Sequence, residues 1–139
     1  MSYEEKGAWV YLVVSVGAFV AYVVVILGRL GAAPVAGVHF VTPLLWCIGV
    51  AIGANIVGRI LFEIARPSES HQVDRRDKEI TRQGEYVGGL VLAILMVVPF
   101  ALALAEVDHF WIANAIYAAF VTYAVTGTVV RLVAYRRGF

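Results

Sequence analysis

The chain has 139 residues, of which 61% are hydrophobic and 15% are charged, and its formal net charge at pH 7 is +1. Soluble domains carry about a quarter charged residues, so this composition argues against a soluble fold. No Asp, Glu, Lys or Arg occurs in four long runs, at residues 7–28, 30–58, 86–105 and 109–130. Each run reaches the roughly 20 residues that a helix needs to cross a hydrocarbon layer of about 30 Å.

We therefore predict an all-α, polytopic membrane protein in which residues 1–139 form one four-transmembrane-helix bundle. The helices are expected at about residues 7–28, 40–64, 74–105 and 109–135. Helices are favoured because backbone polar groups in lipid must be satisfied within each segment. A soluble bundle would instead show polar stripes at helical spacing, and these segments show none.

The first apolar run is expected to stay in the protein as a membrane-spanning helix. Glu4 and Glu5 precede it, and it is longer than the apolar region of an ordinary signal peptide. Trp9 and Tyr11 suit the headgroup zone, where amphipathic rings settle. The connection at residues 28–38 is short and rich in Gly and Ala, so the first two helices should be antiparallel neighbours.

The second segment carries small residues at four-residue spacing. Gly49 and Gly53 form a GxxxG pair, and Ala54 and Gly58 repeat the pattern. Such surfaces let two helix backbones approach closely in a membrane. The partner is either a neighbouring helix of the same chain or another protomer, and the sequence leaves these two alternatives open.

Three polar residues follow on one face of the same segment. Asn55, Arg59 and Glu63 are spaced by four residues, so Arg59 and Glu63 are placed to form an ion pair. One interpretation is an interfacial anchor pair, with Arg59 extending to the headgroups. The other is a polar site within the bundle, because ionisable residues inside membranes are often functional.

The only long hydrophilic run lies between the second and third apolar segments. Arg66–Pro67 is expected to end the second helix. The third helix is expected to begin near Asp74 and to project beyond the bilayer before it enters the membrane at a second GxxxG pair, Gly84 and Gly88. Pro99 should kink its distal half.

The start of this third helix carries charges of alternating sign. Asp74, Arg75, Arg76 and Asp77 open the motif, and Lys78 continues it. A nucleic-acid-binding surface would show a basic patch of one sign, so no nucleic-acid partner is expected. The alternatives are a solvated helix extension and a docking surface for a soluble partner or a second protomer.

The start of the second helix and the turn before the last helix hold residue types that bind metals. His39, Glu106, Asp108 and His109 are all expected at the extracytoplasmic ends of the second, third and fourth helices. Histidine and carboxylates together are reasonable ligands for a divalent metal. The competing interpretation is wet interfacial histidines, with Asp108 as the N-cap of the last helix. No other cofactor is predicted.

The basic residues predict the orientation of the chain. Of the eleven Lys and Arg residues, only Arg29 falls on the side opposite the central loop and the termini. By the positive-inside rule, both termini and the central loop are expected to be cytoplasmic. The residues on the cytoplasmic side are Lys6, Arg59, Arg66, Arg75, Arg76, Lys78, Arg82, Arg131, Arg136 and Arg137.

A family resemblance involves the loop motif and the end of the chain. The run from Asp74 to Asp77, followed by Ile80, Gly84 and Gly88, resembles a pattern in small bacterial four-helix integral membrane proteins, a domain family of unknown function. Those proteins often end in Tyr-Arg-Arg-Gly, as in residues 135–138 here, but carry Glu where this chain has Arg75. The resemblance implies a bacterial inner-membrane protein and supplies no activity.

The sequence favours a non-enzymatic protein that acts by helix association, as a homo-oligomer or as an accessory subunit of a membrane or cytoplasmic partner. The alternatives are a small transporter or channel with a pathway near Asn55, Arg59 and Glu63, and an extracytoplasmic metal-binding protein. No phosphate loop, zinc motif or nucleophile elbow is present, so an enzyme is not expected. Small four-helix multidrug exporters depend on a glutamate within the first helix, and none occurs here.

Overall fold

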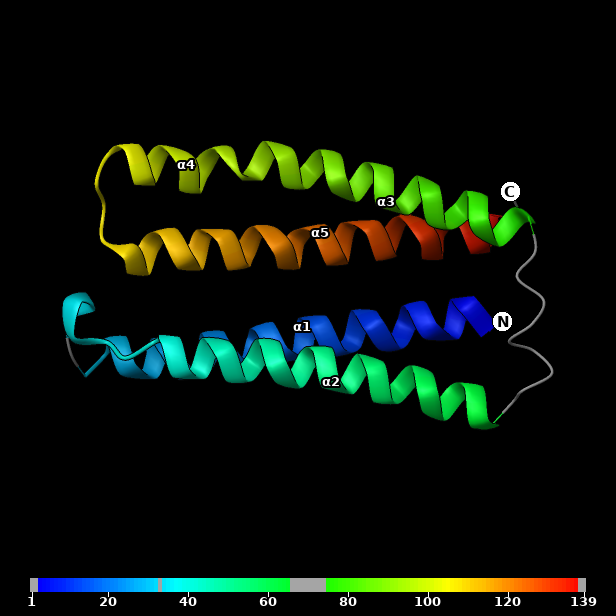
Figure 1. Ribbon diagram of the computed structural model, residues 1–139, viewed down its shortest axis with the longest axis horizontal. Coiled ribbons are helices and arrows are strands. Elements are labelled where there is room, and N and C mark those ends of the chain that lie inside the picture. Colours follow the sequence, from blue (N-terminus) through cyan, green and yellow to red (C-terminus); the bar gives the residue numbers. More distant parts are fainter. Residues whose placement is uncertain (1–2, 33, 66–74, 138–139) are drawn as a thin grey trace.

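The computed structural model describes residues 3–32, 34–65 and 75–137. This part of the chain is all-α (Figure 1), as expected from the sequence. The elements in chain order are α1 (Tyr3–Leu30), the short 3-10 helix η1 (Val35–Gly37), α2 (Val41–Ala65), α3 (Arg75–Leu95), α4 (Val97–Leu104) and α5 (His109–Arg137).

Four helical stretches of the described part are long and apolar enough to cross a membrane. They are Glu5–Leu30, Val41–Leu61, Arg75–Leu104 and His109–Arg137. Helix α1 starts at Tyr3, ahead of the apolar run, since Glu and Lys are good helix formers and nothing breaks the helix before it. The helices therefore extend past the charge-free segments at several ends.

Helices α3 and α4 form one membrane-length stretch that is interrupted at Met96. Pro99 follows one turn later and has no N–H to donate to the Leu95 carbonyl group, which its ring also crowds. Regular bonding resumes where the Phe100 N–H donates to the Met96 oxygen at 3.3 Å. The segment expected as one helix with a kink is thus two elements, divided on the N-terminal side of the proline.

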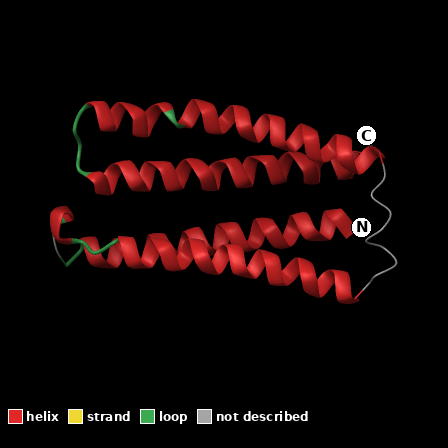
Figure 2. Ribbon diagram, viewed as in Figure 1, coloured by secondary structure: helices red, strands yellow, loops and turns green. Residues whose placement is uncertain are grey.

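The helices form two antiparallel hairpins, α1 with α2 and α3–α4 with α5 (Figure 1). Because α1 also packs against α5, the order across the bundle is α2, α1, α5, α3. Tyr3 and Arg137 lie at one end, called here the terminal end. The opposite end, the loop end, holds η1 and the turn between α4 and α5 (Figure 2).

The best-packed core lies toward the loop end. Tyr22 and Ile26 of α1 contact Val38, Phe40 and Phe110 there, and all five are buried. Phe40 and Phe110 pack edge-to-face with ring centroids 5.1 Å apart, an arrangement that aromatic pairs prefer. This cluster fixes α1 against the start of α5.

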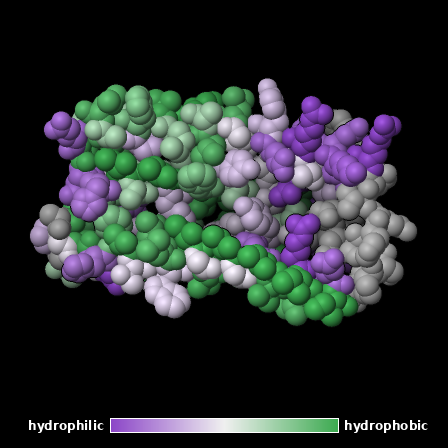
Figure 3. Space-filling view, viewed as in Figure 1, coloured by the Kyte–Doolittle hydropathy of each residue, from purple (hydrophilic) through white to green (hydrophobic). Residues whose placement is uncertain are grey.

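Large apolar side chains cover much of the outside of the bundle. Trp46, Ile64 and Leu104 are each at least 70% exposed. Figure 3 shows apolar residues along the length of the molecule and polar residues gathered mainly toward its ends. An exposed apolar surface of this extent is costly in water and suits a hydrocarbon environment.

Candidate functional site

The glycine pair of α3, Gly84 and Gly88, packs against another helix of the same chain. A Cβ atom added to Gly84 would lie 2.6 Å from the Gly127 carbonyl oxygen of α5, and one added to Gly88 would lie 3.2 Å from the Tyr123 carbonyl oxygen. Gly84, Gly88 and Gly127 are all buried. The absence of side chains at these positions therefore lets the α3 and α5 backbones touch.

Among the described residues, the glycine pair of α2 has no such partner. A Cβ atom added to Gly49 or Gly53 would meet nothing within 4 Å, whereas one added to Gly58 would lie 3.4 Å from Val10 Cγ1 of α1. None of the apolar span Val41–Leu61 is buried. Within the part of the chain that the structure describes, no neighbouring helix therefore packs on Gly49 and Gly53, and contact with another protomer stays a prediction.

The polar residues predicted on α2 do not gather into one site. The Asn55 side-chain amide donates to the Ala51 carbonyl oxygen of its own helix at 2.8 Å. Arg59 and Glu63 are exposed, and these two described residues form no ion pair with each other. The polar pathway thus stays a prediction, and the geometry lends it no support.

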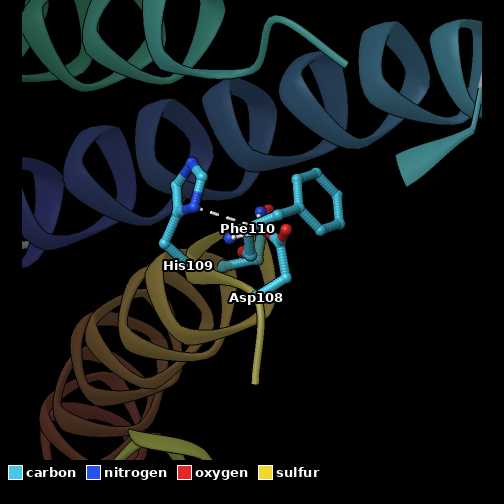
Figure 4. Close-up of polar contacts among 4 residues, drawn as sticks. Asp108, His109 and Phe110 are labelled. Atoms are coloured by element: carbon cyan, nitrogen blue, oxygen red, sulfur yellow. Dashed lines mark hydrogen bonds and ion pairs between the residues drawn. The ribbon is translucent and has the colours of Figure 1, made fainter. Parts of the chain in front are cut away.

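At the loop end, Asp108 caps α5, as its position in the sequence predicted. Its Oδ1 accepts a hydrogen bond from the Phe110 N–H at 2.8 Å and lies 3.6 Å from His109 Nδ1 (Figure 4). The backbone oxygen of His39 accepts a hydrogen bond from Arg29. Within the described residues, no three His, Cys, Asp or Glu side chains are grouped so that they could hold a metal ion.

The fourth predicted metal ligand, Glu106, has a backbone role in the turn. It has φ 52°, in the left-handed region. The N–H groups of Glu106 and Val107 donate to the carbonyl oxygens of Ala103 and Leu102, both at 3.1 Å. This bonding pattern is that of a Schellman motif, which satisfies free carbonyls at a helix end.

Part of the charged motif at the start of α3 binds the end of α5. The Tyr135 hydroxyl donates to Asp77 Oδ1 at 3.0 Å. Arg75 and Arg76 are exposed, and Asp74 lies outside the described residues. Near this contact, the Arg136 guanidinium lies 5.8 Å from the centre of the Trp9 ring of α1. Asp77 thus helps to hold the terminal end together.

A large groove runs between α1, α2 and α5. Its volume is about 740 Å³, and its lining is almost wholly apolar, with Tyr11, Ile48, Ile52, Tyr117 and Phe120 among the residues that form it. The groove exists because α2 has α1 as its main neighbour, which leaves space between α2 and α5. Of the three polar residues predicted on α2, Asn55 alone lines it.

A smaller polar pocket of about 190 Å³ lies between α1, α3 and α5. Glu85 of α3 and Arg131 of α5 both line it, together with Tyr11, Tyr123 and Thr128. The sequence indicates that Arg131 belongs to the end of the last helix, but sequence reasoning misses Glu85 as a residue of a polar site. The spacing of Tyr123, Gly127 and Arg131 by four residues is the signal that could have indicated a polar face here.

Comparison with known protein families, with characterised proteins and with solved structures finds no match for this chain. The resemblance to a bacterial membrane protein family therefore stays a prediction. The fold itself defines a class. In the described part, it is an all-α protein with four helices that are long and apolar enough to cross a membrane.

Proposed function

We propose that this is a multi-pass integral membrane protein that acts by helix association, as a homo-oligomer in which α2 provides the contact. The observation that supports the proposal is the open face of α2, with empty space over Gly49 and Gly53. The similar glycine pair of α3 is already occupied by α5. Two helix backbones approach closely where such residues meet.

A second copy is the favoured partner because a glycine pair is complementary to itself. In a two-fold dimer, the same surface meets on both subunits. Ile60 and Ile64 continue the face toward the terminal end, and both are exposed. An accessory-subunit role would use this face against a different membrane protein.

The proposal places the protein in a bacterial inner membrane with both termini in the cytoplasm. Its support is the charge distribution along the bundle. Lys6, Arg82 and Arg136 belong to the terminal end, and Arg29 belongs to the loop end. Loops and ends rich in Lys and Arg stay on the cytoplasmic side.

The decisive substitution is Gly53→Ile, measured by sedimentation equilibrium in mild detergent and by energy transfer between labelled copies in liposomes. The added side chain separates the two helices, so association should weaken by about tenfold or more, which corresponds to about 1.4 kcal/mol. Gly17→Ile on α1 is the matched control, because a Cβ atom there also meets nothing within 4 Å.

Two results would contradict the proposal. One is a wild-type protein that stays monomeric in liposomes at every protein density tested. The other is equal association of the Gly53→Ile and Gly17→Ile variants. An equal effect of the two variants would show that α2 is not the contact, even if oligomers form.

A further inference from the structure

The apolar groove and the polar pocket lie on the same face of α5. Ala113, Tyr117, Phe120 and Ala124 line the groove, and Ala124 also lines the pocket, as does Arg131. Steps of three, four and seven residues keep all of these positions on one side of a helix. Tyr11 of α1 and Tyr123 of α5 also line both spaces. The two spaces are therefore stacked end to end along the bundle.

The polar end of this combined space holds opposite charges from two helices. Glu85 and Arg131 line the pocket, and within the described residues neither takes part in an ion pair or a side-chain hydrogen bond. Arg131 is half-buried, and its aliphatic stem packs over Gly84. Charges at membrane depth are costly unless something compensates them. The pocket thus offers one anionic and one cationic group to a small ligand.

The Arg131 end of the pocket lies near the headgroup region of a bilayer. Helix α5 has 29 residues, so it is about 43 Å long and matches the roughly 40–45 Å of a bilayer with its headgroups. Arg131 precedes the end of α5 at Arg137 by only six residues, which is about 9 Å along the helix axis. That depth is close to the boundary between headgroups and hydrocarbon.

The apolar groove begins at Ala124, seven residues before Arg131, which is about 10 Å farther into the hydrocarbon. From Tyr123 to Ala113 the groove follows α5 for ten residues, which is about 15 Å. One leaflet of the hydrocarbon layer is about half of 30 Å. From Arg131 to Ala113 the pocket and groove together follow α5 for eighteen residues, about 27 Å, so an acyl chain whose headgroup sits at Arg131 passes along the pocket and its end reaches the near part of the groove.

We propose that the pocket and groove together bind one phospholipid whose headgroup carries both a phosphate and a primary ammonium. The phosphate binds Arg131, whose guanidinium matches phosphate geometry. The ammonium donates hydrogen bonds to the Glu85 carboxylate, and the end of an acyl chain enters the groove. A headgroup with a phosphate alone would leave Glu85 uncompensated beside a second negative charge. This site does not depend on the proposed dimer contact, because Gly49 and Gly53 do not line it.

The test is native mass spectrometry of the delipidated full-length protein, reloaded with defined lipids of identical acyl chains. Phosphatidylethanolamine should bind with one equivalent per chain, and more tightly than phosphatidylglycerol or phosphatidylcholine. Glu85→Gln and Arg131→Gln should each weaken phosphatidylethanolamine binding by about tenfold or more, since each removes one partner of a charge pair. Glu79→Gln and Arg82→Gln are the matched controls, because both residues are exposed on α3 outside the pocket.

A third variant tests the apolar part. Ala51→Phe projects a ring into the groove and should weaken binding of the diacyl lipid without changing either charge. Glu85 is exposed, so Glu85→Gln should fold normally, and circular dichroism checks this. Equal binding of the three lipids, or equal losses in the pocket variants and the α3 controls, would overturn the proposal.

Discussion

Glu106 occupies a backbone conformation that favours glycine. Its φ of 52° lies in the left-handed region, which costs a residue with a side chain roughly 1–2 kcal/mol. The bonds that its turn makes to Ala103 and Leu102 require this conformation. A glutamate expected from the sequence as a metal ligand is thus a position where the backbone is under local strain.

Glu106→Gly should stabilise the protein by about 0.5–1 kcal/mol, because the greater freedom of unfolded glycine offsets part of the relieved strain. Thermal unfolding followed by circular dichroism in detergent measures the gain. Glu106→Ala is the control, since it removes the carboxylate but keeps the Cβ atom. An equal gain for the two variants would mean that the charge, and not the backbone, is responsible.

Tyr22 and Asn114 form a polar link between the two hairpins. The Tyr22 hydroxyl donates to Asn114 Oδ1 at 2.7 Å, and Tyr22 is 2% exposed. Asn114 in turn donates to the Phe110 carbonyl oxygen of its own helix at 2.8 Å. The phenol also packs edge-to-face on Tyr117 with ring centroids 5.2 Å apart, so the hydroxyl can be removed without losing the ring contacts.

Tyr22→Phe should lower the free energy of unfolding by about 0.6–1.7 kcal/mol, the range for hydrogen bonds between membrane helices. Unfolding by increasing SDS in mixed micelles gives the value. Tyr86→Phe, at a position 73% exposed on α3, should have no measurable effect. Similar losses in both variants would count against the interhelical bond.

Among the described elements, α3 and α5 have the most extensive contact. Gly84 of α3 faces the Gly127 carbonyl oxygen of α5, and the stem of Arg131 covers the same glycine. A methyl group added at Gly84 would therefore have to displace the α5 backbone as well as the Arg131 side chain. Helix α2 differs, because a Cβ atom added to Gly49 or Gly53 would meet no described atom within 4 Å.

Gly84→Ala should destabilise the protein by about 1–3 kcal/mol, as overpacking of a close contact does. Gly17→Ala, where nothing lies within 4 Å of the new Cβ, should be neutral or stabilising by up to about 1 kcal/mol, because alanine is the better helix former. SDS unfolding curves of the two variants give the comparison. A neutral Gly84→Ala variant would contradict the close α3–α5 contact.

At the scale of the whole molecule, the open face of α2 should be the surface that meets a second copy. The only cysteine, Cys47, is half-buried on α2 against the core at the loop end. Its replacement by serine leaves a background in which single cysteines report on proximity between copies. The two-fold axis of a dimer brings residues of this face close to their own counterparts.

In the Cys47→Ser background, Ile60→Cys should form a disulfide-linked dimer on mild oxidation in native membranes. Val13→Cys should not, because it is exposed on a different helix, α1. Non-reducing gel electrophoresis separates the two outcomes. Equal cross-linking at both positions would indicate random collision rather than a defined interface.

The charge-free runs by themselves determined the four helices, because a helix in lipid satisfies its backbone within its own segment. Local chemistry also located the cap at Asp108 and indicated a kink at Pro99, whereas the division into two helices at Met96 came from the structure. Only the tertiary structure decided which glycine pair packs against another helix of the chain. It alone joined Tyr22 to Asn114 by a hydrogen bond and placed Glu85 and Arg131 in the lining of one pocket. The physical reason is that helices in lipid have no apolar stripe that selects one face, so their mutual rotation depends on packing between segments distant in the chain.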